Sequence, residues 1–249
     1  MTVPADLLVL LVVVGGALVG AVASGLAGFA FAACTLGLYA HFLPPGVVSP
    51  LVVAASLSVQ LIVLPMIWRR LDWRAALPFL LGGICGVPFG AALLTVLSAD
   101  TFRHVAGGLL LLYALTVLGA RRLPALRFDS RVADAAVGFG GGVLGGFAGL
   151  SGILPTIWCS LRRWPKDRQR SVFQLFNSAM HIVTLSVYAT QGRLTAEVGW
   201  LLLAALPAIG LGAWLGFSLY HRIDDKVFAR VLLVLLALSG LALLAPLFE

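Results

Sequence analysis

Long stretches without any charged residue constrain the fold of this chain more than any other feature. They cover nearly the whole sequence: 7–68, 75–99, 104–120, 135–161, 171–192, 198–220 and 231–248. A helix needs about 20 apolar residues to cross the hydrocarbon core of a bilayer. Continuous runs of this length indicate helices, and they exclude the alternating pattern of an outer-membrane barrel. The sequence therefore predicts an all-α, polytopic membrane protein.

Composition supports lipid as the solvent. The chain of 249 residues is 61% hydrophobic and 11% charged, with a mean hydropathy of +1.05. Its formal net charge of +7 would suggest nucleic acid in a soluble protein. Here the cations fall in short loops between apolar runs, where membrane orientation explains them. We expect the lipid bilayer and a small solute as partners, with no nucleic acid and no cofactor; a homo-oligomer is possible.

An internal repeat divides the chain into two halves. The tetrapeptide Gly25 to Gly28 (GLAG) matches Gly149 to Gly152 (GLSG), and Gly86 and Gly90 match Gly212 and Gly216 at a similar offset. We expect a first transmembrane repeat over 1–120, a linker over 121–131 and a second repeat over 132–249, each with about four helical elements.

The loop charges predict that the two repeats are inverted. Lys and Arg cluster around Arg69, in the linker, around Lys166 and around Lys226, whereas the remaining loops hold only Arg103 and Arg193. The four clusters lie on the same side of the membrane only if one half is inverted relative to the other. Because Lys and Arg concentrate in cytoplasmic loops, that side is then the cytoplasmic one. Inversion requires an odd number of crossings per half. The first element of each half must therefore be broken or re-entrant, and the Gly-rich motifs are the expected positions.

Broken helices predict an anion site. Half-helix N-termini that meet near the bilayer midplane offer unpaired N–H groups and a partial positive charge, and many transporters with inverted repeats use them in this way. The candidate binding residues at the breaks are Gly25, Ala27, Gly28, Gly149, Ser151 and Gly152.

The charge-free run 171–192 holds more polar residues than the other runs, and it adds further candidates. Gln174, Asn177, Ser178 and His181 follow a spacing of i, i+3, i+4, i+7 and so share one helix face. Polar groups at membrane depth either line a substrate path or join helices by hydrogen bonds. From this face we select Asn177, Ser178 and His181 as substrate-binding candidates, and Gln60 from the first half.

The chain resembles the TauE/SafE sulfite exporter family over nearly its whole length. The motifs that carry the resemblance are SGLAGF (24–29), GVPFGA (86–91), GGFAGLSGILP (145–155) and GLGAWLG (210–216). The resemblance implies a secondary transporter, not an enzyme, that exports sulfite or an organosulfonate across the bacterial inner membrane.

Two alternatives stay open at this point. The chain could be a permease for another small anion. It could also be an intramembrane serine protease of the rhomboid type, since Gly149 to Gly152 spells GxSG and His181 could act as the base. The repeat disfavours the protease, because Ala27 stands where the second half has Ser151.

Overall fold

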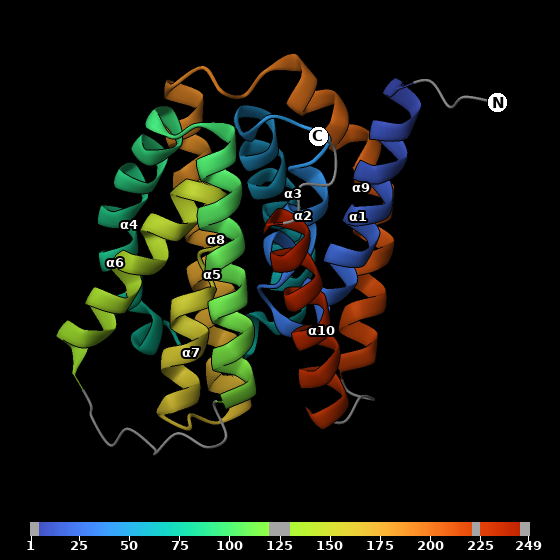
Figure 1. Cartoon of the computed structure of the whole chain (residues 1–249). Coiled ribbons are helices and arrows are strands. Elements are labelled where there is room, and N and C mark those ends of the chain that lie inside the picture. The colour runs from blue at the N-terminus through green and yellow to red at the C-terminus, as the bar shows by residue number, and fades with distance from the viewer. Residues whose placement is uncertain (1–4, 120–129, 221–224, 245–249) are drawn as a thin grey trace.

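The computed structural model describes residues 5–119, 130–220 and 225–244, and these residues form ten α-helices and one 3₁₀ turn (Figure 1). The predicted all-α class is confirmed for this part of the chain. Most of the predicted linker lies outside the described residues, including its cations at 121, 122 and 127; so do His221 and Arg222. The elements are α1 (Ala5–Ala27), α2 (Phe31–Tyr39), α3 (Pro45–Ile67), η1 (Trp68–Arg70), α4 (Trp73–Val96), α5 (Ala99–Gly119), α6 (Arg131–Ala148), α7 (Ile153–Leu161), α8 (Lys166–Thr190), α9 (Ala196–Tyr220) and α10 (Asp225–Leu244).

Five of these helices, α1, α3, α4, α8 and α9, are long and apolar enough to cross a membrane. Large apolar side chains on the outer helices point away from the protein: Leu81 and Phe89 of α4 are 58% and 62% exposed, and Leu203 of α9 is 60% exposed. An apolar surface of this extent is unfavourable in water and suits contact with lipid. The protein is a multi-pass membrane protein.

The first helix pair, α1 and α2, forms an antiparallel hairpin. The chain turns at Gly28, which has a φ of +85°. Near the open end, the Tyr39 hydroxyl donates to the carbonyl oxygen of Val13 over 2.6 Å. Between these points, Gly20 of α1 leaves room for Thr35 and Phe31 of α2. The α2 helix therefore runs back along α1.

The second helix pair, α6 and α7, forms a corresponding hairpin. Its turn follows Gly149, which has a φ of +72°. At the open end, Asp134 accepts hydrogen bonds from Trp158 Nε1 at 2.7 Å and Arg162 Nη1 at 2.8 Å. The Asp134 and Arg162 side chains are only 7% and 5% exposed. This buried ion pair fixes the two ends of the hairpin together.

Each hairpin packs mainly on a helix of the other half, α1 against α9 and α6 against α4. Glycines make the approach close. A methyl group added at Gly142 would overlap the Gly83 carbonyl, and one at Gly86 would overlap the Phe139 carbonyl. A methyl group added at Gly216 of α9 would likewise overlap the Val22 carbonyl of α1. Most of the repeated glycines are thus packing residues, which membrane helices favour.

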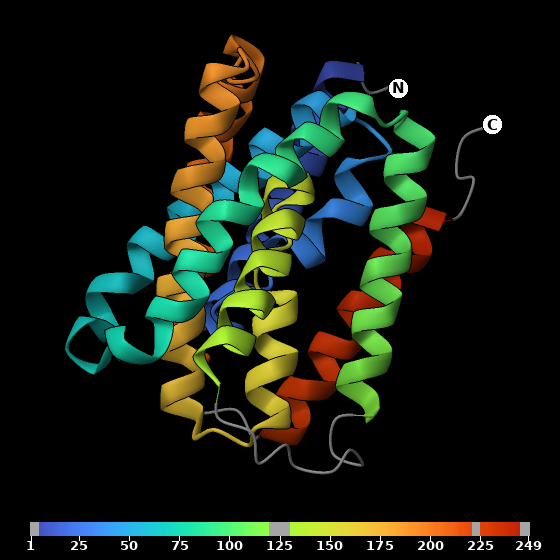
Figure 2. The same ribbon diagram turned by 90° about the vertical axis from the view of Figure 1, so that its left-hand side faces the viewer.

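The two hairpins open toward opposite ends of the molecule (Figures 1 and 2). The start of α1 lies at one end, with the α8–α9 turn, and α10 runs toward that end. The opposite end holds η1 and the α7–α8 turn, and most of the described Lys and Arg residues belong to these segments or to the helix ends beside them; Arg103 belongs to the start of α5 and Arg193 to the α8–α9 turn.

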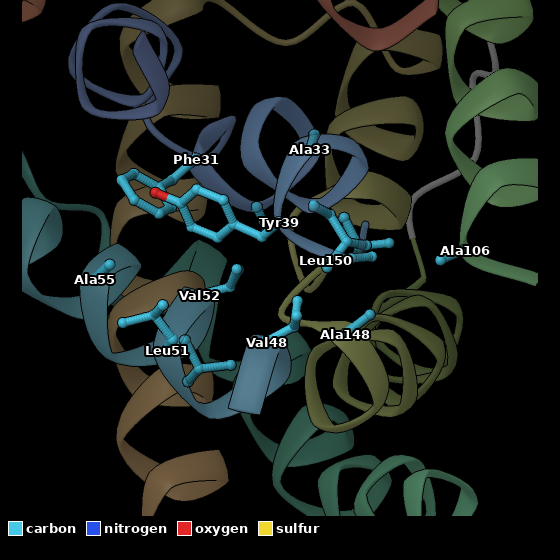
Figure 3. Close-up of a cluster of buried hydrophobic side chains, with 14 of the residues drawn as sticks. Phe31, Ala33, Tyr39, Val48, Leu51, Val52, Ala55, Ala106, Ala148 and Leu150 are labelled. Carbon is cyan, nitrogen blue, oxygen red and sulfur yellow. The ribbon is translucent and has the colours of Figure 1, made fainter. Parts of the chain in front are cut away.

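The tip of the second hairpin lies on an apolar surface of α3. Figure 3 shows Ala148 and Leu150, which flank Gly149, beside Val48 and Val52. All four side chains are at most 2% exposed. This contact holds the tip against α3.

The glycine contacts generate a prediction about stability. Gly142→Leu should lower the apparent melting temperature of the detergent-purified protein by the equivalent of about 2 kcal/mol or more, because the added side chain meets rigid backbone. Gly108→Leu is the matched control, since Gly108 lies in α5 with no atom within 4 Å of the added Cβ. Equal melting temperatures for the two variants would contradict this packing scheme.

Candidate functional site

The tips of the two hairpins meet at Asn177. The carbonyl oxygen of Gly28 accepts hydrogen bonds from Gln60 Nε2 at 2.8 Å and from Asn177 Nδ2 at 3.5 Å. The Ser151 hydroxyl donates to Asn177 Oδ1 over 2.6 Å. One amide side chain therefore contacts both tips, and we call this place the junction: Gly28, Gln60, Ser151, Gly152 and Asn177.

The junction lies deep in the helix bundle. Asn177 is the twelfth of the 25 residues of α8, so it lies near the middle of a membrane-spanning helix. Gln60, Ser151 and Asn177 are each at most 1% exposed. Polar groups at such a depth are costly unless they are paired with one another or with a polar solute.

Glycine gives the second tip its shape. The Gly149 N–H donates to the Gly145 carbonyl at 2.9 Å, and the Leu150 N–H donates to the Leu144 carbonyl at 3.2 Å. This pair of bonds ends a helix with a left-handed residue, a conformation that glycine adopts without strain. A Cβ at Gly152 would lie 2.7 Å from the Cβ of Phe29, so glycine also lets the tips approach each other.

Side chains cap the carbonyl ends of α1 and α6. At the end of α1, Arg170 donates to the Gly25 carbonyl at 2.9 Å and to the Leu26 carbonyl at 3.2 Å. At the end of α6, Ser49 donates to the Phe147 carbonyl at 3.2 Å, and the Tyr188 hydroxyl donates to the Gly146 carbonyl at 2.6 Å. These donors offset the partial negative charge of both helix C-termini.

The amide ends at the tips differ from the carbonyl ends. Helix α2 begins after Ala30 and α7 begins after Gly152, and neither residue supplies a side-chain cap. The first N–H groups of a helix have no partner within it and carry a partial positive charge. The carbonyl ends at the tips are thus capped by side chains, whereas Ala30 and Gly152 give the amide ends no side-chain cap; the Ile153 N–H donates to the Leu150 carbonyl over 3.3 Å.

Several buried polar atoms near the junction have no hydrogen-bond partner among the described residues. They are Ser24 Oγ, Ser56 Oγ, Gln174 Oε1 and His181 Nδ1. Each belongs to a residue about one helical turn from Gly28, Gln60 or Asn177. Buried polar groups are normally paired, so this cluster suits a place where a polar solute passes.

The structure brings some predicted site residues together and uses others elsewhere. Ser178 donates to the Gln174 carbonyl of its own helix at 2.7 Å, and the 3% exposed His181 makes no Nδ1 hydrogen bond among the described residues. The protease interpretation needs a bond between Ser151 and His181, whereas the Ser151 hydroxyl donates to Asn177.

Gly25 and Gly149, which the sequence repeat pairs, differ in conformation. Gly25 and Ala27 both lie inside α1, and Gly28 is the residue that shares the left-handed conformation of Gly149. Gly25 instead packs on α9, where an added Cβ would lie 2.7 Å from the Ala213 carbonyl oxygen. The motif holds two glycines, and its letters alone do not indicate which of them ends the helix.

Sequence reasoning missed Arg170, Ser49 and Tyr188. A signal for Arg170 was present, because it precedes Gln174 by four residues and so extends the polar face of α8. Ser49 and Tyr188 cap α6 through contacts between distant parts of the chain, and no local pattern indicates such contacts.

A multi-pass bundle with two helix hairpins and a buried polar junction is the architecture of a membrane transport protein. The family model described as "Sulfite exporter TauE/SafE" matches residues 12–243. The chain therefore belongs to the TauE/SafE sulfite exporter family, whose members are membrane transporters and not enzymes. Neither a curated protein nor a solved structure matches the chain.

The turn at Gly149 generates a second prediction. Gly149→Ala should destabilise the protein by more than the roughly 1 kcal/mol that a left-handed alanine costs, since its Cβ would also lie 3.2 Å from Val52 and Val53. Gly192→Ala is the matched control, because Gly192 has a φ of +68° and open space around it. Thermal unfolding in detergent measures both. If Gly149→Ala lowered the melting temperature no more than Gly192→Ala does, the result would contradict the contact of Gly149 with α3.

Proposed function

We propose that this protein is a secondary transporter that exports a small sulfur-containing anion, sulfite or an organosulfonate, across the bacterial inner membrane. The anion binds at the junction, between the uncapped amide ends of α2 and α7. The observation that carries the proposal is the asymmetry of the caps. Side chains neutralise the carbonyl ends of α1 and α6, whereas neither α2 nor α7 has a side-chain cap.

Backbone binding suits a small oxyanion. Helix N-termini bind sulfate- and phosphate-like groups through N–H donors without burying a Lys or Arg beside them. Asn177 and Gln60 add amide donors, and the unpartnered atoms of Ser24, Ser56 and His181 offer further polar contacts. In this scheme Gly25 and Ala27 shape the first tip from within α1 rather than bind the anion, and Ser178 contributes through its own helix.

An inverted repeat supports alternating access. In the proposed correspondence, α1 to α5 match α6 to α10, and each hairpin packs on the fourth helix of the other half. The hairpins open toward opposite ends, so each end can expose one side of the junction (Figure 2). Most inverted-repeat transporters move one bundle against another around a fixed site.

The alternative to a sulfur-containing substrate is another small anion. The family supports a sulfur anion, whereas the junction geometry distinguishes charge and size but not sulfur from carbon. A panel of sulfite, sulfoacetate, thiosulfate, sulfate and acetate therefore separates these substrates. Uptake into inverted membrane vesicles should be fastest for a sulfur anion, and fastest uptake of acetate would contradict the proposed substrate class.

Substitutions at the junction test the site itself. Asn177→Asp should reduce uptake at least tenfold, because a carboxylate beside the bound anion repels it, and such repulsion costs several kcal/mol. Ser151→Ala should keep most of the activity, since the anion is assigned to backbone N–H groups. Equal uptake by wild type and Asn177→Asp, at equal protein amounts, would place the anion elsewhere.

Orientation is testable without a substrate. We predict that both termini face the periplasm and that the loops around Arg69 and Lys166 face the cytoplasm, because cations concentrate at that end. Single cysteines placed at 70 and 166 in a cysteine-free variant should resist a membrane-impermeant maleimide in intact cells, whereas one at 193 should react. Labelling at 166 but not at 70 would contradict the inverted arrangement.

A further inference from the structure

A cavity of about 250 Å³ lies at the basic end of the bundle, between the end of α3, the start of α8 and the end of α9. Its polar wall carries Asp167, Arg170 and Ser171, and its aromatic wall carries Phe217 and Tyr220. The volume suits an ion of the size of sulfite together with some water.

Arg170 is held rigidly in this cavity. Two of its nitrogens donate to the end of α1, and its guanidinium carbon lies 3.9 Å from the ring centroid of Tyr220 and 5.3 Å from that of Phe217. Arg170 is only 7% exposed, and its Nε has no hydrogen-bond partner among the described residues. A fixed guanidinium with a remaining donor is well suited to bind an oxyanion.

The charge of Arg170 is less compensated than that of its neighbours. Arg162 pairs with Asp134 at 2.8 Å, and Arg168 lies 3.5 Å from Asp72. Within the described residues, Arg170 has no carboxylate at ion-pair distance. Asp167 lies in the same cavity, and it reduces the local positive potential.

The cavity lies at one end of the polar face of α8. Arg170, Gln174, Asn177 and His181 follow a spacing of i, i+4, i+7, i+11, so one face of the helix joins Arg170 to the junction. The contact of Arg170 with Gly25 and Leu26 places it close to the end of the broken helix α1.

We infer that this cavity is a second anion site, in which Arg170 binds the small oxyanion on the cytoplasmic side before it passes to the junction. The inference rests on the proposed export function for its direction. Binding of an anion in the cavity does not depend on transport, so the cavity site and the proposed export function can fail separately.

The experiment measures sulfite binding and transport in three variants. Arg170→Gln should raise the KM for uptake into inverted vesicles at least tenfold. Asp167→Asn should lower the KM about threefold, because it removes a negative charge from the cavity. Arg168→Gln, which changes a paired neighbour, is the matched control and should stay within twofold of wild type.

Calorimetric titration of sulfite into the detergent-purified protein separates this inference from the proposed function. Weaker binding by Arg170→Gln but not by Arg168→Gln supports the cavity site, even if no sulfite is transported. Since Arg170 also caps α1, its variant could fold poorly, and the melting temperature reports this. In that case Asp167→Asn is the deciding variant, because Asp167 is exposed and its substitution should not disturb folding. Unchanged sulfite affinity and unchanged KM in Asp167→Asn would overturn the inference.

Discussion

The need to satisfy backbone polar groups inside the bilayer governs this structure. A helix that ends at membrane depth leaves unpaired carbonyl and N–H groups where water does not compete for them. Here two helices end in this way, at Ala27 and Ala148. Arg170, Ser49 and Tyr188 satisfy their carbonyl ends, and Gln60 and Asn177 satisfy the turn at Gly28. Ala30 and Gly152, which precede the two return helices, supply no side-chain cap, and this difference is the basis of the proposed anion site.

The second constraint is the close packing that holds the two helix hairpins. Short helices of nine residues, such as α2 and α7, gain little stability from their own hydrogen bonds. Their longer partners, α1 and α6, are fixed by backbone contact with α9 and α4, and glycine is the residue that allows it. The Asp134–Arg162 pair and the Tyr39 bond to Val13 then tie the open ends of the hairpins. These contacts lie along the two long helices and at the open ends of the hairpins, away from the tips.

The sequence predicts the helical class, the membrane environment and the polar face of α8 because each follows from local hydrophobicity or periodicity. It also points to both tips, through glycines that the chain repeats. The sequence does not show which glycine forms the turn after α1, because Gly25 and Gly28 are equivalent in the motif until the end of the helix is known. The caps at Gly146 and Phe147 were not predictable for a different reason: Tyr188 and Ser49 reach them across the fold, and long-range contacts leave no local pattern. Arg170 falls in the basic cluster around Lys166, directly before the run 171–192, although its spacing from Gln174 places it on the polar face.

The central claim is that an anion binds between the amide ends of α2 and α7. Selenite has the shape and charge of sulfite, and selenium scatters X-rays anomalously. The most direct measurement is therefore the anomalous difference map of crystals grown with selenite at a concentration that saturates uptake. The account predicts a selenium peak at the junction, with its oxygens about 3 Å from backbone nitrogens at the starts of α2 and α7. A fully ordered junction without a peak, at a concentration where uptake is saturated, would contradict it.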